Sequence, residues 1–508
     1  MTDNSQELKA DADHPNILFI HAESMDGRKM GCMGNGAMTE ATPHLDSLAE
    51  RGTLFTEAYS NCPVCNPSRA SMWSGKYPHF YDCWNNHEGL DEAVPTFRTT
   101  FQRAGYRTAA IGPLDYQWGK HSIRDRIGSW TRSAEIHRPI SRTPMPQIAD
   151  DDQPTWGGDW ERTHQATNFL RKAAGGDRPF MLYLTTGLVH PAFCAQKQYL
   201  ERINEDEIQI PPTLGGLDRA EHPVDKYMRI TKNCSRPFSP SLVRKMRHIY
   251  YAMISTLDDM VGHILRTLRD LGLSESTYIV FSSDHGEMAG EHNQILKRSM
   301  YEASVHEPLI IAGPDVEQGA TVSRPVSLID LYPTLMDMAR ISYNDFASHP
   351  RYPDSLDGQS LMPLLGGEND PSRRDWVFGE YNGDRCCTGS YMLRRGRWKY
   401  IKHVGYNPKL FDLQDDPWEE NNVAAEKPEI AAEMEGILAD NFACEQIDAR
   451  AKSYDRQSFR QWRRHAREEG TYRETMAHVY SGYDRQSIEE LRPWREEDEQ
   501  KIEQWLGE

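Results

Sequence analysis

Long apolar runs are missing from this sequence. No window of about eighteen consecutive apolar residues occurs among its 508 residues, which excludes a hydrophobic membrane-spanning helix. The stretch from Met1 to His14 is polar and acidic, and it lacks the basic start and apolar centre of a secretion signal. We therefore expect no membrane partner and a cytoplasmic location.

Cysteine and positive charge are also scarce. Nine cysteines are spread without even spacing, a pattern that does not fit a disulfide framework and favours a reducing compartment. Lysine and arginine total 58 against 76 aspartates and glutamates, which gives a net charge of -18. This charge repels nucleic acid, so we expect no nucleic-acid partner. It also repels polyanionic sugars, so an anionic substrate requires a local basic pocket.

The most informative stretch that is present runs from Asn61 to Lys76 and reads NCPVCNPSRASMWSGK. Cys65 is followed by Pro67, which stiffens the backbone, and Arg69 lies within one helical turn of Cys65. We therefore expect a stiff loop that presents Cys65 as a reactive group. We expect a helix from about Ala70 whose N-terminal amides face an anion. Lys76 follows this segment, where it either helps to neutralise the anion or is solvated.

Two other interpretations of this stretch stay open at this point. Cys62 and Cys65 also form a C-x-x-C pair, which in a cytosolic chain is found in redox motifs and in zinc sites. No second C-x-x-C and no thioredoxin-like setting accompany it. A buried, inert cysteine is the other alternative.

The run C-x-P-S-R followed by S-G-K-Y-P resembles the signature of the type I sulfatases. In that family the cysteine is oxidised after synthesis to formylglycine, and the hydrated aldehyde is the nucleophile. The resemblance implies that Cys65 becomes formylglycine and that a formylglycine-generating maturation enzyme is a partner. It also implies a catalytic role for Arg69.

Two apolar runs end in residues that can bind a metal. The first, from Pro15 to Ile20, is followed by Glu23, and the second, from Thr277, ends in Asp284 and His285. Parallel strands deliver side chains to a shared edge of the sheet, so we expect these three residues around one divalent cation. The alternative for Glu23 is a solvated carboxylate at the end of a strand.

The expected cation is calcium, with manganese or magnesium as alternatives, because oxygen and imidazole ligands admit all three and imidazole favours manganese somewhat. The resemblance implies that an oxygen of modified Cys65 completes the ligand shell. Many relatives carry two aspartates at the end of the first strand. Here Glu23 falls on the first position and Ser24 on the second.

Two further residues are assigned from the resemblance. His190 follows the apolar run from Phe180 to Leu184, where the family places a histidine that donates a proton to the leaving oxygen; a lone histidine is otherwise an ordinary residue. Lys297 lies twelve residues after His285 in a segment similar to the family's Lys-x-x-x-Tyr-Glu. In the family this lysine bridges the sulfate and the leaving oxygen.

A set of short motifs narrows the match. Trp-Asn-Asn, Ala-Gly-Tyr-Arg-Thr, Leu-Asp-Tyr and His-Ser-Ile occur in this order and resemble the arylsulfatase K branch, whose members remove the 2-sulfate from glucuronate. One departure is Pro113, which stands where most sulfatases have a sulfate-binding lysine. We expect Lys120 or His121 to replace that contact. Asn86 is expected to donate to a substrate oxygen, with turn packing as the alternative.

The expected fold class is α/β. Alternating strands and helices indicate layers, and the resemblance implies a three-layer α/β/α domain of alkaline-phosphatase type over residues 1–370. Residues 371–508 are expected to form a smaller α+β subdomain, with an antiparallel sheet and then helices from Pro428. The tail beyond Gln457 is expected to be a strap over the main domain or the contact of a homo-oligomer.

These observations leave three functions to distinguish. The favoured one is hydrolysis of a sulfate monoester, on a uronic-acid sugar (as a 2-O-sulfate) or on an aryl sulfate. The second is a phosphonate monoester or phosphodiester hydrolase of the same superfamily, whose members also lack the lysine at the position of Pro113. The third is a decayed, metal-binding relative with a structural role, against which the intact signature residues argue.

Overall fold

The computed structural model describes residues 14–117, 123–134, 136, 147–150, 155–215, 221–232, 234–343, 355–368, 370–480 and 494–507. Among these residues, no helix combines the length and the apolar character that crossing a membrane requires.

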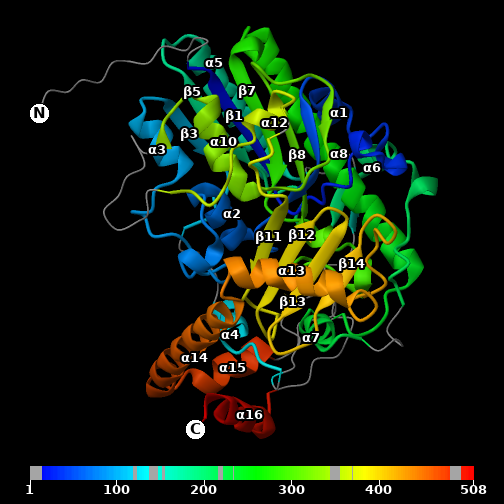
Figure 1. Ribbon diagram of the computed structural model, residues 1–508, viewed down its shortest axis with the longest axis vertical. Coiled ribbons are helices and arrows are strands. Elements are labelled where there is room, and N and C mark those ends of the chain that lie inside the picture. The colour runs from blue at the N-terminus through cyan, green and yellow to red at the C-terminus, as the bar shows by residue number, and fades with distance from the viewer. Residues whose placement is uncertain are drawn as a thin grey trace, which may run out of the picture.

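A mixed sheet of eight strands forms the centre of the larger part (Figure 1). The strand order is β10-β2-β8-β7-β1-β5-β3, with β9 paired to β2. β8 runs antiparallel to both of its neighbours, and the other pairs are parallel. The bounds are β1 Asn16–Ala22, β2 Thr53–Tyr59, β3 Arg107–Ile111, β5 Phe180–Thr185, β7 Thr277–Ser283, β8 His306–Ala312, β9 Ala320–Val322 and β10 Val326–Ser327.

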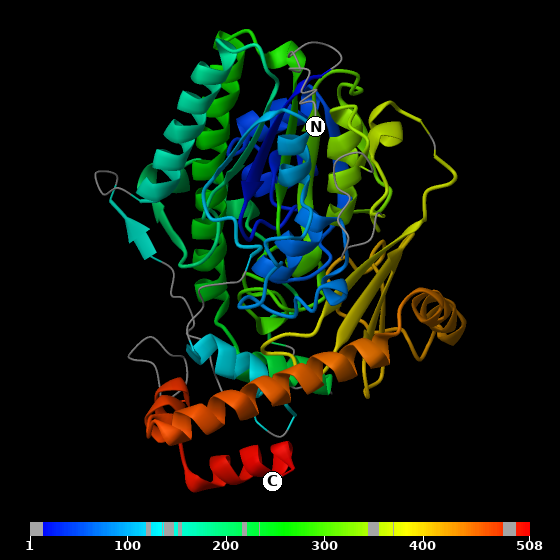
Figure 2. The ribbon, with the colours of Figure 1, turned by 90° about the vertical axis from the view of Figure 1, so that its left-hand side faces the viewer.

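Helices cover both faces of this sheet (Figure 2). Side chains of β1 alternate between two cores, with Leu18 and Ile20 in one and Ile17 and Phe19 in the other, as the twofold period of a strand requires. The first core contains α1 Pro43–Glu50, α5 Gly157–Ala174, α6 Lys197–Leu200 and α8 Pro240–Asp270. The second contains α2 Cys65–Ser74, α3 Phe97–Arg103, α10 Leu331–Met338 and α12 Met362–Leu365. The predicted three-layer α/β/α architecture is confirmed.

The predicted antiparallel sheet is confirmed as well. It has four strands in sequence order, and α13 Pro428–Asn441 packs across one face through Met434 and Leu438 (Figure 1). The strands are β11 Trp376–Tyr381, β12 Ser390–Arg395, β13 Trp398–His403 and β14 Lys409–Asp412. A domain boundary between residues 370 and 371 stays a prediction.

The C-terminal helices pack on the chain itself. α14 Cys444–Glu468, α15 Tyr472–Tyr480 and α16 Glu496–Leu506 surround α4 Ile123–Trp130 in one apolar cluster. Buried residues recur along α14 every three or four positions, but Asp455 and Arg463 lie among them. These charges hide the amphipathic pattern in the sequence. The tail therefore acts as a strap, and a contact between copies stays a prediction.

Two short strands and two further α-helices remain among the described residues. β4 Gln147–Ala149 pairs in parallel with β6 Cys194–Gln196. α7 Pro223–Thr231, in the poorly patterned excursion after residue 200, and α9 Glu302–Val305 join a core beneath the small sheet.

Candidate active site

The carboxyl ends of β1 and β7 meet at one edge of the large sheet. The two strands are parallel neighbours, and Ala22 pairs with Ser283 at their last positions. Glu23 follows the first strand, and Asp284 and His285 follow the second. The structure thus brings together the three residues that the sequence predicted as cation ligands.

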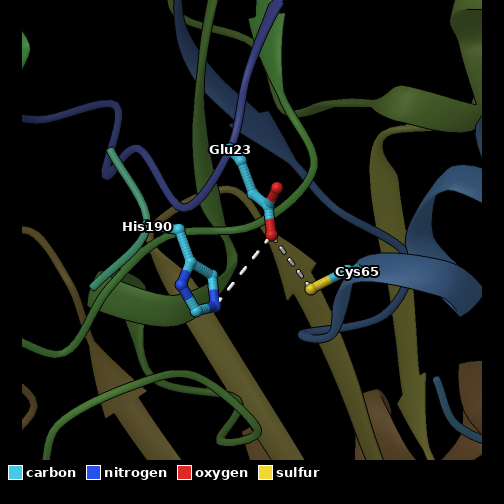
Figure 3. A group of neighbouring side chains, drawn as sticks. All are labelled: Glu23, Cys65 and His190. Atoms are coloured by element: carbon cyan, nitrogen blue, oxygen red, sulfur yellow. Dashed lines mark hydrogen bonds and ion pairs between the residues drawn. The ribbon is translucent and has the colours of Figure 1, made fainter. Parts of the chain in front are cut away.

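Cys65 lies directly opposite this edge. It is the first residue of α2, not part of a loop as the sequence suggested, because Val64 is extended and the helix begins at once after it. The Cys65 Sγ lies 3.2 Å from His285 Nε2, 3.5 Å from Glu23 Oε1 and 3.7 Å from Asn86 Nδ2. Figure 3 shows Glu23 and His190 facing this sulfur. All ten residues of α2 are buried, so the helix holds Cys65 rigidly.

Arg69, one turn after Cys65, is fully buried and joins three elements. Its Nε donates to Asp284 Oδ2 at 2.8 Å, its Nη2 lies 3.3 Å from Glu23 Oε2, and its Nη1 donates to the carbonyl of Pro113 at 2.6 Å. Burial opposes ionisation of Asp284, but His285 and Arg69 outweigh it and hold its pKa well below the usual range. At Glu23 the effect of burial outweighs the attraction of Arg69, so the pKa of this carboxyl is raised.

His190 lies at the partly exposed side of the site, and the buried Lys297 lies beside it. Lys297 Nζ lies 2.6 Å from His190 Nε2, whose distance to Glu23 Oε1 is 4.0 Å. The other ring nitrogen, Nδ1, contacts the Pro191 carbonyl at 2.5 Å. Burial and then Lys297 lower the pKa of His190 to about 3. The His190 side chain is 34% exposed, so solvent reaches the site on this side.

The donor set fits a divalent cation. One ligand atom from each of Cys65, Asp284 and His285 lies within 4.8 Å of the others, and the same holds for Glu23, Cys65 and His190. His285 Nδ1 lies 2.9 Å from the Gly286 carbonyl, and donation there leaves an Nε2 lone pair aimed at the site. Ser24 Oγ is buried without a hydrogen-bond partner among the described residues. Carboxylate oxygens and imidazole are ligands of hard and borderline cations.

The remaining predicted residues fall into three groups. Asn86 is part of the site, and its Oδ1 accepts from the backbone N–H of Asn66 at 3.0 Å, so its amide is held with Nδ2 toward Cys65. Lys76 pairs with Asp357 at 2.7 Å and is buried, so it neither contacts the anion region nor faces solvent. Lys120 and His121 lie outside the described residues.

The redox and zinc interpretations of the Cys62 and Cys65 pair lose support, whereas a buried cysteine remains compatible with the structure. Cys62 belongs to none of the close sets of ligand atoms found among the described residues, and all nine cysteines are free. Burial raises the pKa of the Cys65 thiol to about 12. A thiol of this kind is neither a redox thiolate nor a ready nucleophile.

Sequence reasoning missed a small cavity of about 100 Å³ beside Asn86, lined also by His87, Asp125, Ser129, Arg298 and Asp384. Arg298 Nε donates to Asp384 Oδ1 at 2.9 Å. Arg298 directly follows Lys297, so its position beside a predicted site residue was a usable signal. Asp384 carried no such signal, because it comes from the loop between β11 and β12.

Comparisons with known proteins find related sequences over most of the chain. The Sulfatase family model matches residues 15–341, and the model named N-sulphoglucosamine sulphohydrolase, C-terminal, matches residues 290–442. Arylsulfatase K from Bos taurus is 36% identical over 481 residues, which cover 90% of this chain and 87% of the relative.

Two solved structures show the same fold. The phosphonate monoester hydrolase of Agrobacterium radiobacter has a TM-score of 0.69 at 24% identity, covering 86% of this chain and 96% of its own. A protein described as a 2-O GAG sulfatase has a TM-score of 0.63 at 24% identity, covering 84% of this chain and 91% of its own. With its family match over residues 15–341 and its relative at 36% identity, the chain belongs to the sulfatase family of sulfuric ester hydrolases.

Proposed function

We propose that this protein hydrolyses the 2-O-sulfate of a uronic-acid sugar by means of a formylglycine formed from Cys65. The main support is the set of side chains around Cys65, the first residue of a buried helix. His285, Glu23 and Asn86 each place a polar atom within 3.7 Å of Cys65 Sγ. The similarity to arylsulfatase K over 90% of the chain supports the choice of a sulfated substrate.

Each residue has a distinct task in this proposal. Glu23, Asp284 and His285 hold a divalent cation, which would supply Lewis-acid stabilisation of negative charge beside the nucleophilic hydroxyl of hydrated formylglycine. Arg69 fixes both carboxylates through its three contacts. The N-terminus of α2 adds a partial positive charge where the anion binds.

The leaving oxygen needs a proton, and the pair of His190 and Lys297 holds one. Because Lys297 Nζ and His190 Nε2 are 2.6 Å apart, either group can pass that proton to an oxygen bound at the partly exposed side. General-acid catalysis of this kind contributes roughly 10²–10⁴-fold to the rate. A maturation enzyme that modifies Cys65, calcium as the cation and a cytoplasmic location remain part of the proposal.

The test is one panel of substrates assayed on a single formylglycine-bearing preparation: an aryl sulfate, a 2-sulfated glucuronide, a phosphonate monoester and a phosphodiester. The 2-sulfated glucuronide is expected to give the highest kcat/KM. The alternative function, hydrolysis of a phosphonate monoester or a phosphodiester, is suggested by Pro113, because proline cannot make the charged contact to the anion that a lysine would make at this position. A clear lead for the phosphonate or the phosphodiester would overturn the proposed substrate class.

A further inference from the structure

A second, larger cavity lies between the C-terminal helices and the small sheet. Its volume is about 530 Å³, within the range of roughly 300–1,000 Å³ that small-molecule sites occupy. Its walls come from the segment after α4, from the loop before β12, from the loop after β13, and from α14 and α16. Its lining residues include Arg132, Tyr406, Asp455, Arg456, Lys501 and Trp505.

The innermost pair in this cavity is incompletely satisfied. Arg132 Nε donates to Asp455 Oδ2 at 2.6 Å, and the two residues are 3% and 1% exposed. Arg132 Nη2 and Asp455 Oδ1 are both buried without a hydrogen-bond partner among the described residues. A buried polar group without a hydrogen bond is destabilising. The pair therefore offers one donor and one acceptor to a polar ligand.

The outer part of the cavity is basic and aromatic. Arg456 and Lys501 are exposed, and Arg456 stacks over the Trp505 ring at 5.8 Å. Lys452 also lines the cavity, but it pairs with Asp448 at 2.7 Å. Two cationic side chains beside aromatic rings thus surround a donor and acceptor pair, in a protein whose net charge is -18. A sugar ring that bears hydroxyls and one anionic group matches this set.

The cavity lies near the small cavity beside Asn86, because two segments of the chain line both. Ser129 lines the small cavity at Asn86, and Arg132 lines the large one three residues later. On the opposite wall, Asp384 lines the small cavity and Cys387 the large one. Arg132 Nη1 also donates to the Cys386 carbonyl at 3.4 Å, which joins the two walls. Figure 1 shows α4 between the C-terminal helices and the rest of the chain.

We propose that this cavity is a subsite for a second acidic sugar of an oligosaccharide substrate, and this rests on the proposed function. The reacting sulfate ester lies at Cys65, and the chain extends past Asn86. Hydroxyls of the distal sugar bond to Arg132 Nη2 and Asp455 Oδ1, and its carboxylate or sulfate pairs with Arg456 and Lys501. The C-terminal helices then select oligosaccharides over single sugars.

The test compares Arg456→Ala combined with Lys501→Ala against a matched control, Lys245→Ala combined with Arg269→Ala. The control removes two exposed charges from α8, and neither residue lines the cavity. Three substrates are used: an aryl sulfate, a 2-sulfated glucuronide and a uronic-acid tetrasaccharide sulfated on its terminal uronate. We expect the cavity variant to raise KM only for the tetrasaccharide, by roughly three- to tenfold, with kcat unchanged. An unchanged KM, or an equal rise for all three substrates, overturns the subsite.

A binding measurement separates this result from failure of the proposed function. The probe is a tetrasaccharide of alternating uronic acid and amino sugar, titrated calorimetrically into the full-length chain and its variants. If the protein cleaves a phosphonate and no sulfate, the proposed function fails, and binding alone decides the subsite. Weaker binding to the cavity variant than to the control supports the subsite; equal binding to both overturns it.

Discussion

Arg69 and Asp284 form a fully buried ion pair, with Arg69 Nε 2.8 Å from Asp284 Oδ2 and neither side chain exposed. The same guanidinium reaches Glu23 and the Pro113 carbonyl. One side chain therefore fixes two of the proposed cation ligands relative to the helix that carries Cys65. The position of the metal site depends on this arginine.

We predict that Arg69→Lys abolishes most activity and lowers stability. A lysine ammonium cannot make three divergent contacts in one plane, and breaking a buried pair costs about 3–5 kcal/mol. Thermal unfolding and kcat/KM for an aryl sulfate measure the two effects. Arg107→Lys, on the partly exposed strand β3, is the control and should change neither. Full activity of Arg69→Lys contradicts the assigned role.

The cation assignment predicts that Glu23→Gln lowers bound metal far below that of the unaltered protein, because an amide oxygen lacks the charge of a carboxylate. Metal content after gel filtration, measured by mass spectrometry, is the readout. A third close set of ligand atoms, from His44, Asp258 and Asp259, lies away from the proposed cation ligands along the chain and provides the control. Asp258 accepts from the backbone N–H groups of His44 and Leu45, so that set stabilises the start of α1. Asp259→Asn should leave the metal in place; if only Asp259→Asn loses it, the site is wrongly placed.

His190→Gln should lower kcat more for substrates with poor leaving groups than for substrates with good ones. A sugar hydroxyl leaves poorly without a proton, whereas a nitrophenol leaves as the anion. We expect kcat to fall by roughly 10²-fold or more for a sulfated sugar and by much less for a nitrophenyl sulfate. The ratio of the two losses is the measurement. Equal losses would show that His190 has another task and that Lys297 alone serves the leaving oxygen.

Lys399 is predicted to be critical for the packing of the small sheet. Its Nζ lies 2.9 Å from Glu302 and 2.8 Å from Glu419, and it is fully buried. Lys399→Met leaves two buried carboxylates without their cation, which should cost about 3–5 kcal/mol. On the same strand, Lys402 pairs with Glu435 and Glu445, which are 37% and 65% exposed. Lys402→Met should cost only about 0–1 kcal/mol. Equal shifts of the unfolding midpoint would refute this account.

The residues that the sequence located correctly share one property. Glu23, Asp284 and His285 each follow an apolar strand, so their place was set by strand ends and parallel pairing. Local patterns sufficed because neighbouring strands bring their ends together whatever lies between them. The small antiparallel sheet was predicted for a different reason, because its short strands follow one another along the chain with tight turns between them.

Pairs of polar side chains that are far apart in the sequence could not be predicted from local patterns. The buried pair of Lys76 and Asp357 joins positions 281 apart, and no local pattern marks that partner. The start of α2 at Cys65 depends on the packing of its ten buried residues rather than on a side-chain cap. Arg132 and Asp455 are 323 positions apart, so the cavity they line has no sequence signature.

The central claim is that modified Cys65 performs the chemistry, and the direct measurement relates activity to modification. Preparations made with different amounts of maturation enzyme would be analysed by mass spectrometry of the Cys65 peptide and assayed for sulfate ester hydrolysis. The account predicts that kcat rises in proportion to the formylglycine fraction and reaches zero when that fraction is zero. A fully active preparation with an intact Cys65 thiol would contradict it.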